Sequence, residues 1–165
     1  MDRPDFIKNY KEIQDEDNAH YPGSDELLSI GSPFGKKFGL IKLGIHHEVL
    51  PPGRRTSWPH AESDEEEFVY VIEGNPDVWI DGHLHRLNPG DGVGFPGGTA
   101  ICHSFLNNTN ISVRLLVVGE TKKKENKCFY ALHPERNELA KKEGWLWENH
   151  PIREMGGHGG TPNKN

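Results

Sequence analysis

The sequence has only two cysteines, Cys102 and Cys128, and they are too far apart to form a metal-binding pair. So few cysteines exclude a disulfide-rich secreted scaffold. The first residues lack the basic start, apolar stretch and small-residue cleavage site of a secretory leader. We therefore expect a cytosolic protein whose cysteines are reduced and buried as small apolar side chains.

Long apolar runs and excess positive charge are also missing. No run approaches the roughly 20 apolar residues that cross a bilayer, so we expect no membrane partner. Lysine and arginine number 19 against 25 aspartates and glutamates, and the formal net charge is −6. Nucleic-acid binding requires a basic face, so we expect no nucleic-acid partner either.

Glycine and proline, in contrast, are abundant, at 19 and 12 of 165 residues. Between residues 25 and 120, short apolar stretches recur, each bounded by Gly, Pro, Asn or Asp. Asp81-Gly82 separates two of them and indicates a hairpin, because such a turn needs positive φ angles. Regularly spaced short strands are typical of β-sandwiches and barrels. The length fits one domain, so the sequence predicts a single all-β barrel over residues 25–120.

The segment before this region, residues 1–24, is a polar arm. It contains one short helical pattern, in which Phe6, Tyr10 and Ile13 fall on one face. A helix this short is stable only if that face docks on the body of the protein.

The segment after it, residues 121–165, is a C-terminal extension. Cys128–Leu132 is a candidate strand. Pro134, at a first helical position, and Gly144, as a stop signal, predict one short helix between them. The glycine-rich end of the extension predicts a flexible tail.

One group of histidines and carboxylates has the spacing of a barrel site. His60 and Glu62 are two residues apart, so on a strand they face the same side. Glu67 begins the next apolar stretch, and His103 belongs to a later one. Side chains that converge from several strands are what a preorganised metal site requires.

These residues lie in two segments that resemble the paired motifs of the cupin superfamily. In the first segment, His60 and Glu62 occupy the His-x-His positions. Glu67, followed by six residues and a glycine, occupies the glutamate position. In the second segment, residues 90–107, His103 begins the closing His-x-x-x-Asn.

The resemblance covers about residues 40–120. It implies a cupin double-stranded β-helix, or jelly-roll barrel, with one divalent metal ion held by His60, Glu62, Glu67 and His103. Glu62 departs from the family, which normally has histidine there. Two carboxylates make the ligand set harder, which favours iron or manganese and leaves zinc and nickel as alternatives. A barrel that has lost its metal is the other interpretation.

Other histidines are interpreted by their position along the strands. His83 and His85 form the only literal His-x-His, but they follow a hairpin turn that cupins place away from the metal, so we expect both on the surface. His46 and His47 are adjacent on a strand, so one faces inward, and the sequence does not decide which. We assign His47 to the substrate lining, together with Trp58, which precedes the ligand strand.

Two functions fit these observations. The first is a metal-dependent enzyme that acts on a small polar metabolite as a dioxygenase, isomerase or lyase; no catalytic residue is assigned. The second is a non-catalytic module that binds a small molecule, with or without metal. The outward apolar residues of Phe68–Ile72 and Val113–Val118 must be covered by the N-terminal arm, the C-terminal tail or a second subunit. By analogy with small cupins, we expect a homodimer.

Overall fold

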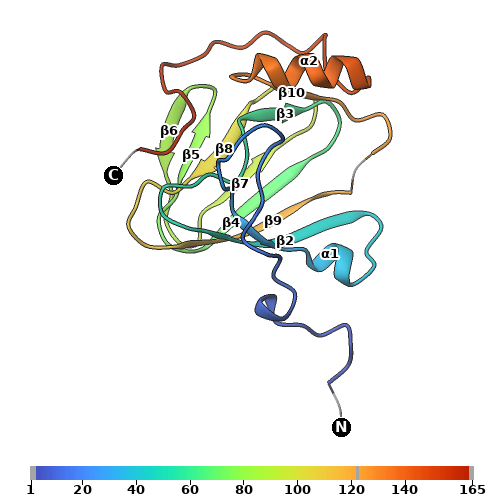
Figure 1. Ribbon diagram of the computed structural model, residues 1–165, viewed down its shortest axis with the longest axis vertical. Coiled ribbons are helices and arrows are strands. Elements are labelled where there is room, and N and C mark those ends of the chain that lie inside the picture. Colours follow the sequence, from blue (N-terminus) through green and yellow to red (C-terminus); the bar gives the residue numbers. More distant parts are fainter. Residues whose placement is uncertain (1–2, 122, 164–165) are drawn as a thin grey trace.

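The computed structural model describes residues 3–121 and 123–163, and its body consists of two antiparallel sheets (Figure 1). The outermost residues of the predicted arm and extension, and residue 122, lie outside this range. The first sheet contains β1 (Ile30–Ser32), β2 (Leu43–Leu50), β4 (Glu67–Glu73), β7 (Gly92–Phe95) and β9 (Val113–Glu120). The second contains β3 (His60–Glu62), β5 (Asp77–Ile80), β6 (His83–Arg86), β8 (His103–Leu106) and β10 (Cys128–Tyr130).

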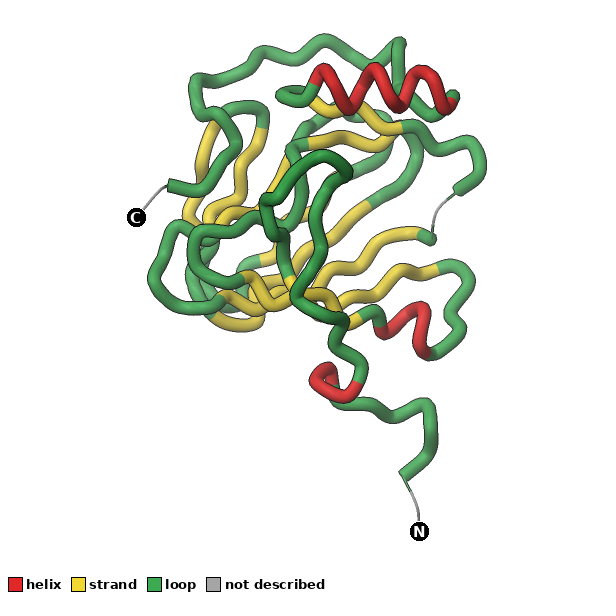
Figure 2. Tube along the Cα trace, in the orientation of Figure 1, coloured by secondary structure: helices red, strands yellow, loops and turns green. Residues whose placement is uncertain are grey.

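The strand order is β1-β2-β9-β4-β7 in the first sheet and β10-β3-β8-β5-β6 in the second. Apart from β1–β2 and the β5–β6 hairpin, neighbours in each sheet are not consecutive in the sequence, as β2 and β9 are not, because the chain crosses repeatedly from one sheet to the other. Figure 2 shows the strands wrapped around a common interior, with loops at both ends. The predicted all-β, jelly-roll architecture is confirmed.

The barrel interior is apolar at one end and polar at the other. β2 pairs with β9 along its whole length, from Leu43 with Glu120 to Leu50 with Val113. Alternate side chains of each strand face inward. One end is therefore filled by a buried apolar cluster, Leu50, Val69, Val71, Val78, Leu87, Phe95, Phe105, Val113 and Leu115. The opposite end of β2 directs polar side chains into the interior and leaves room for a site.

The predicted Asp81-Gly82 hairpin is present between β5 and β6. Asp81 has φ 45° and Gly82 has φ 86°, the positive values that a two-residue turn needs. Gly82 is also required by close packing, since a Cβ atom there would lie 2.4 Å from the backbone of Gly156.

The helical pattern predicted in the N-terminal arm is present only as one 3₁₀ turn, Tyr10–Glu12. The arm projects from the body at its start (Figure 1), and Phe6 is exposed, so most of the pattern has nothing to dock against. Its two later members do contact the body. Ile13 is buried, and the Tyr10 ring stacks on the His47 ring at 3.9 Å between centroids.

The C-terminal extension adds one strand and one helix. β10 pairs antiparallel with β3. The predicted helix is confirmed as α2 (Pro134–Glu143), and it ends at Gly144, whose φ is 81°. Both cysteines are free and buried, as expected. A further single-turn helix, α1 (Phe34–Lys37), precedes β2, and no helix in residues 3–121 or 123–163 is long and apolar enough to cross a membrane.

The glycine-rich tail, for which the composition predicts flexibility, makes specific contacts with the body of the protein. It runs beside the β5–β6 hairpin (Figure 1), where Gly156 N–H donates to the Asp81 carbonyl at 2.7 Å. His158 N–H donates to the Gly82 carbonyl at 3.0 Å, and its own carbonyl accepts from the Trp79 indole at 2.8 Å. Glycine allows the tail backbone to approach the hairpin this closely, which composition alone does not reveal.

Candidate functional site

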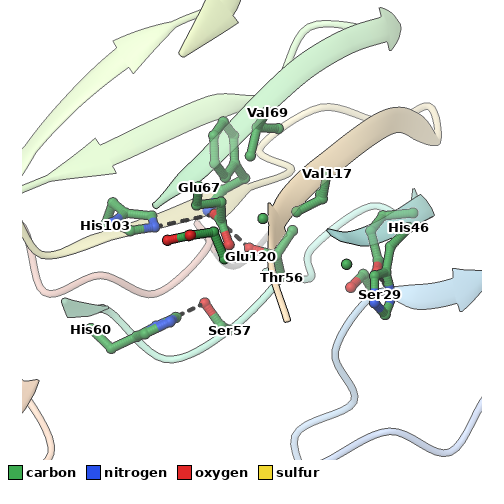
Figure 3. Close-up of a pocket in the computed structure, with 14 residues that line it drawn as sticks. Ser29, His46, Thr56, Ser57, His60, Glu67, Val69, His103, Val117 and Glu120 are labelled. Carbon is green, nitrogen blue, oxygen red and sulfur yellow. Dashed lines mark hydrogen bonds and ion pairs between the residues drawn. The ribbon is translucent and has the colours of Figure 1, made fainter. Parts of the chain in front are cut away.

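A cavity of about 280 Å³ lies at the polar end of the barrel interior (Figure 3). Both sheets contribute to it, through β2, β4 and β9 on one side and β3 and β8 on the other. Its polar side chains are Ser29, His46, Glu48, Thr56, Ser57, His60, Glu67, His103 and Glu120. Three of the four predicted metal ligands therefore line this cavity, and all four line a smaller one of about 20 Å³.

His60 and His103 lie side by side on neighbouring strands of the second sheet. They are register partners on the antiparallel strands β3 and β8, and their ring centroids are 5.5 Å apart. The His103 ring is fixed further by Phe95, which stacks on it at 3.5 Å with an interplanar angle of 5°. Two imidazoles are thus held close together by the strand pairing itself.

Both imidazoles are anchored through the same ring nitrogen. His60 Nδ1 lies 2.8 Å from the Trp58 carbonyl oxygen, and His103 Nδ1 lies 3.1 Å from the Ile101 carbonyl oxygen. A carbonyl oxygen can only accept, so each Nδ1 carries the hydrogen and donates it. In the neutral rings the lone pair is then on Nε2. Metal-binding histidines in proteins are oriented by this type of second hydrogen bond.

Each Nε2 points toward a carboxylate. His103 Nε2 is 3.2 Å from Glu67 Oε1, at the start of β4, and His60 Nε2 is 3.8 Å from Glu62 Oε1. Burial raises the pKa of Glu67, but the hydrogen bond and charge of His103 outweigh it and leave the pKa lowered. An ionised carboxylate facing an imidazole lone pair needs a proton or a cation between them.

Glu62 lies on the same side of β3 as His60, as the two-residue spacing predicts, but it is also engaged elsewhere. Its Oε2 accepts a hydrogen bond of 2.6 Å from the Asn126 side chain. Within residues 3–121 and 123–163, no three His, Cys, Asp or Glu side chains are arranged so that they could hold a metal ion. The donor chemistry therefore fits a divalent cation, while the side chains do not close around one as they stand.

The histidine of β2 that lines the cavity is His46, not His47. His47 is buried on the opposite face of the strand beneath Tyr10, and both of its ring nitrogens lack a hydrogen-bond partner. Strand alternation permits only one of the two to face inward. Burial lowers the pKa of His46, which keeps its ring neutral near pH 7.

Glu48 is a cavity residue that the sequence did not single out. It follows His46 by two residues on β2, and its Oε1 lies 3.6 Å from His46 Nδ1. Burial, assisted by the charges of Glu67 and Asp15 and opposed by a hydrogen bond from Ser29, raises the pKa of Glu48 to about 7. The same two-residue spacing that links His60 and Glu62 could have identified it.

Trp58 lies outside the cavity. Its ring is stacked between Tyr21, at 4.1 Å, and His133, at 3.9 Å, and its indole N–H donates to Glu26 at 3.0 Å. It supports the loop that leads into β3 and does not touch the cavity, so its predicted lining role does not match its position.

His83 and His85 lie on β6 and are exposed, as predicted for the literal His-x-His pair. They are remote from the cavity, which is lined from β2, β3, β4, β8 and β9. Substitution of this pair can therefore serve as a control for substitution of the histidines in the barrel interior.

Comparison with known proteins finds a family model and several solved structures that this chain resembles. Residues 46–119 match the family model described as "Cupin domain". A protein from Silicibacter pomeroyi described as a sugar phosphate isomerase of the cupin superfamily is 32% identical; 62% of this chain aligns with 65% of that one at a TM-score of 0.60. The chain thus spans just under two thirds of that protein's length. No curated protein matches the sequence.

Two further structures agree in fold. A putative sugar phosphate isomerase from Acidithiobacillus ferrooxidans is 25% identical, with 81% of this chain aligned to 83% of that one at a TM-score of 0.67. The polyketide cyclase RemF from Streptomyces resistomycificus is 17% identical, with coverages of 85% and 97% and a TM-score of 0.60, and it shares the fold alone. The motifs, the barrel and these matches agree: residues 46–119 are similar to a cupin domain, and the chain has the fold of the cupin proteins that it resembles.

Proposed function

We propose that this barrel is a metal-dependent enzyme that acts on a small, hydroxyl-rich metabolite. His60, Glu67 and His103 would hold one divalent ion, with Glu62 as a fourth ligand once Asn126 releases it. The single observation that carries this proposal is that both imidazoles donate through Nδ1 to a carbonyl and so direct Nε2 into the cavity. Two imidazoles with two carboxylates favour iron or manganese over softer metals. Such an ion supplies Lewis-acid chemistry to a bound oxygen.

The other side of the cavity would supply proton transfer. Glu48, whose pKa is raised to about 7, is partly protonated at neutral pH and can both take and return a proton. His46 beside it stays neutral and can orient a substrate hydroxyl. Moving a proton between neighbouring carbons is what an aldose–ketose isomerisation requires. The names of the Silicibacter and Acidithiobacillus proteins make isomerisation the reaction class we favour.

Loss of either anchored histidine is expected to abolish metal binding. The protein expressed in medium containing iron, manganese, zinc and nickel should contain about one of these ions per chain. His60→Ala and His103→Ala should each reduce that content to background in elemental analysis, because each removes one of only two imidazole ligands. Thermal melting of the same samples establishes that both variants are folded.

The matched control is the double variant His83→Ala/His85→Ala, which also removes imidazoles but from the exposed β6. It should retain the metal of the wild type. Metal-free wild-type protein, or a metal content that neither cavity substitution changes, would refute the metal site.

One observation favours a second function, a non-catalytic module that binds a small molecule. Asn126 holds Glu62, and the described side chains do not close around an ion. If this alternative holds, a stabilising ligand will raise the melting temperature equally in chelator and in metal.

We also propose that two copies associate through the outer face of the first sheet. Phe68, Tyr70 and Ile72 alternate with the inward residues of β4, and they are 45%, 40% and 36% exposed. The N-terminal arm, with exposed Phe6 and Ile7, projects from the same side of the barrel, where Tyr10 meets the outer face of β2 (Figure 1). A second copy would cover both apolar surfaces at once.

Phe68→Asp is therefore expected to convert a dimer into a monomer, because it places a charge within that apolar face. Light scattering after size exclusion measures the mass directly. Ile152→Asp is the control, since Ile152 is 97% exposed and lies in the segment after α2. A monomeric wild type, or a Phe68→Asp variant that remains dimeric, would contradict the proposed interface.

A further inference from the structure

The cavity continues outward into a second one of about 500 Å³, which shares with it Ser29, His46, Glu48 and Thr56. The outer cavity is bordered by the N-terminal segment, whose Asp15, Glu16 and Asn18 line it. The two together form a path from His60, deep in the barrel, to solvent. A substrate that reaches the barrel interior by this path must pass these side chains.

Apart from its histidines, the ionisable side chains that line this path are carboxylates. Carboxylates line it at Asp15, Glu16, Glu48, Glu67 and Glu120, and none of its lining residues in the described part of the chain is a lysine or arginine. Glu120 is neutralised by Lys123 Nζ at 2.6 Å, outside the lining. The inner carboxylate Glu67 faces His103. Three carboxylates are left. Glu48 lies at the junction of the two cavities, and Asp15 and Glu16 line the outer cavity.

The arginines nearest to the path are already paired. Arg54 forms a double hydrogen bond to Asp17, and Arg55 forms one to Glu26. Proteins usually bind a phosphate group with arginine or lysine side chains. The described lining offers hydroxyls instead, from Ser29, Thr56 and Ser57.

We propose that the substrate is a small, hydroxyl-rich compound that carries an amino group and no phosphate. Its ammonium would lie near Glu48 and Asp15, and its hydroxyls would reach inward toward Thr56, Ser57 and His60. This inference deepens the proposed function, since it names the substrate class of the same cavity. It departs from the sugar phosphates named for the two similar proteins. The inner volume of about 280 Å³ is just below the range of roughly 300–1,000 Å³ for small-molecule sites, which favours a small substrate.

The test compares matched sugars with the full-length chain, loaded with manganese and also in chelator. Each of several hexoses is titrated as the neutral sugar, the 2-amino sugar and the 6-phosphate, by calorimetry at low salt. We expect the best amino sugar to bind about tenfold more tightly than its neutral counterpart, because two to three carboxylates act on one ammonium. That preference should shrink in 0.5 M salt, which screens it. The phosphates should bind most weakly.

A charge-matched pair of variants isolates the outer carboxylates. Asp15→Asn/Glu16→Gln should bring the amino and neutral sugars to within about twofold of each other, because the attracting charge is gone. Asp5→Asn/Glu154→Gln removes the same charge from exposed residues outside both cavities and should leave the preference unchanged.

Tighter binding of any phosphate than of its amino counterpart overturns the inference, and so does the absence of binding by every amino sugar. Metal content measured on the same samples separates the two proposals. An amino-sugar preference that persists in metal-free protein leaves this inference intact and removes the proposed metal chemistry. A metal-loaded protein that prefers phosphates overturns this inference and leaves the proposed metal chemistry intact.

Discussion

Glu48→Gln is expected to make the protein more stable than the wild type at pH 8, by about 3 kcal/mol at most. The Glu48 side chain is only 14% exposed, and burial with neighbouring negative charge raises its pKa from the ordinary 4.5 to about 7. Ionising it in the folded protein is therefore unfavourable, whereas ionising it in the unfolded chain is not. A glutamine of the same shape never ionises, so it avoids this loss.

The pH window follows from the same shift. Below pH 4.5, Glu48 is protonated in both states and the two proteins should be equally stable. Between pH 4.5 and about 7 the folded state binds the extra proton, so wild-type stability falls as pH rises and the gap to the variant grows. Above about pH 7 the gap should stay constant.

Urea denaturation at several pH values, with chelator present, measures this difference. Glu154→Gln serves as the control, because Glu154 is exposed and should show no gap at any pH. A Glu48→Gln variant that is less stable than the wild type at pH 8 would contradict this prediction. It would mean that the folded protein stabilises the ionised carboxylate of Glu48.

Arg55→Ala is expected to lower the free energy of unfolding by about 3–5 kcal/mol, the second large effect. Arg55 is 2% exposed, and its guanidinium forms two hydrogen bonds to Glu26, of 2.8 and 2.6 Å. A third nitrogen hydrogen-bonds to the carbonyl of Gly160 at 2.7 Å. Removing the cation leaves the partly buried Glu26 carboxylate and a carbonyl without their partner.

Arg54→Ala provides the comparison within the same loop. Arg54 also pairs with a carboxylate, Asp17, but that partner is 47% exposed and the pair is accessible to water. Its loss should therefore lower the free energy of unfolding by no more than about 1 kcal/mol. Equal losses for the two arginines in urea denaturation would show that burial does not distinguish them.

The barrel and the inner site were predictable because they depend on short-range rules. Two-residue spacing places His60 and Glu62 on one side of β3, and turn chemistry sets the Asp81-Gly82 hairpin. The same alternation left His46 and His47 undecided, since the inward face of β2 depends on how that strand meets β9. The spacing of Glu48 two residues after His46 places the two on one side of β2, but the burial that raises the pKa of Glu48 is not expressed by any local pattern.

Long-range contacts account for most of what the sequence could not show. The hydrogen bond from Asn126 to Glu62 joins residues 64 positions apart and changes what the carboxylate is free to do. Trp58 is enclosed by Tyr21 and His133, from segments on either side of the barrel sequence. Composition predicted a loose tail, whereas the fit of Gly156 against Gly82 depends on two backbones meeting.

The contact between Arg55 and Gly160 has a consequence for synthesis of the protein. Arg55 belongs to the loop that leads into His60, and its partner carbonyl lies 105 residues later in the chain. When the ribosome has added residue 119, it has not yet synthesised Gly160, which completes this contact. The nascent barrel can pair its strands during translation, but the loop before its first histidine acquires its last partner only after residue 160 has emerged.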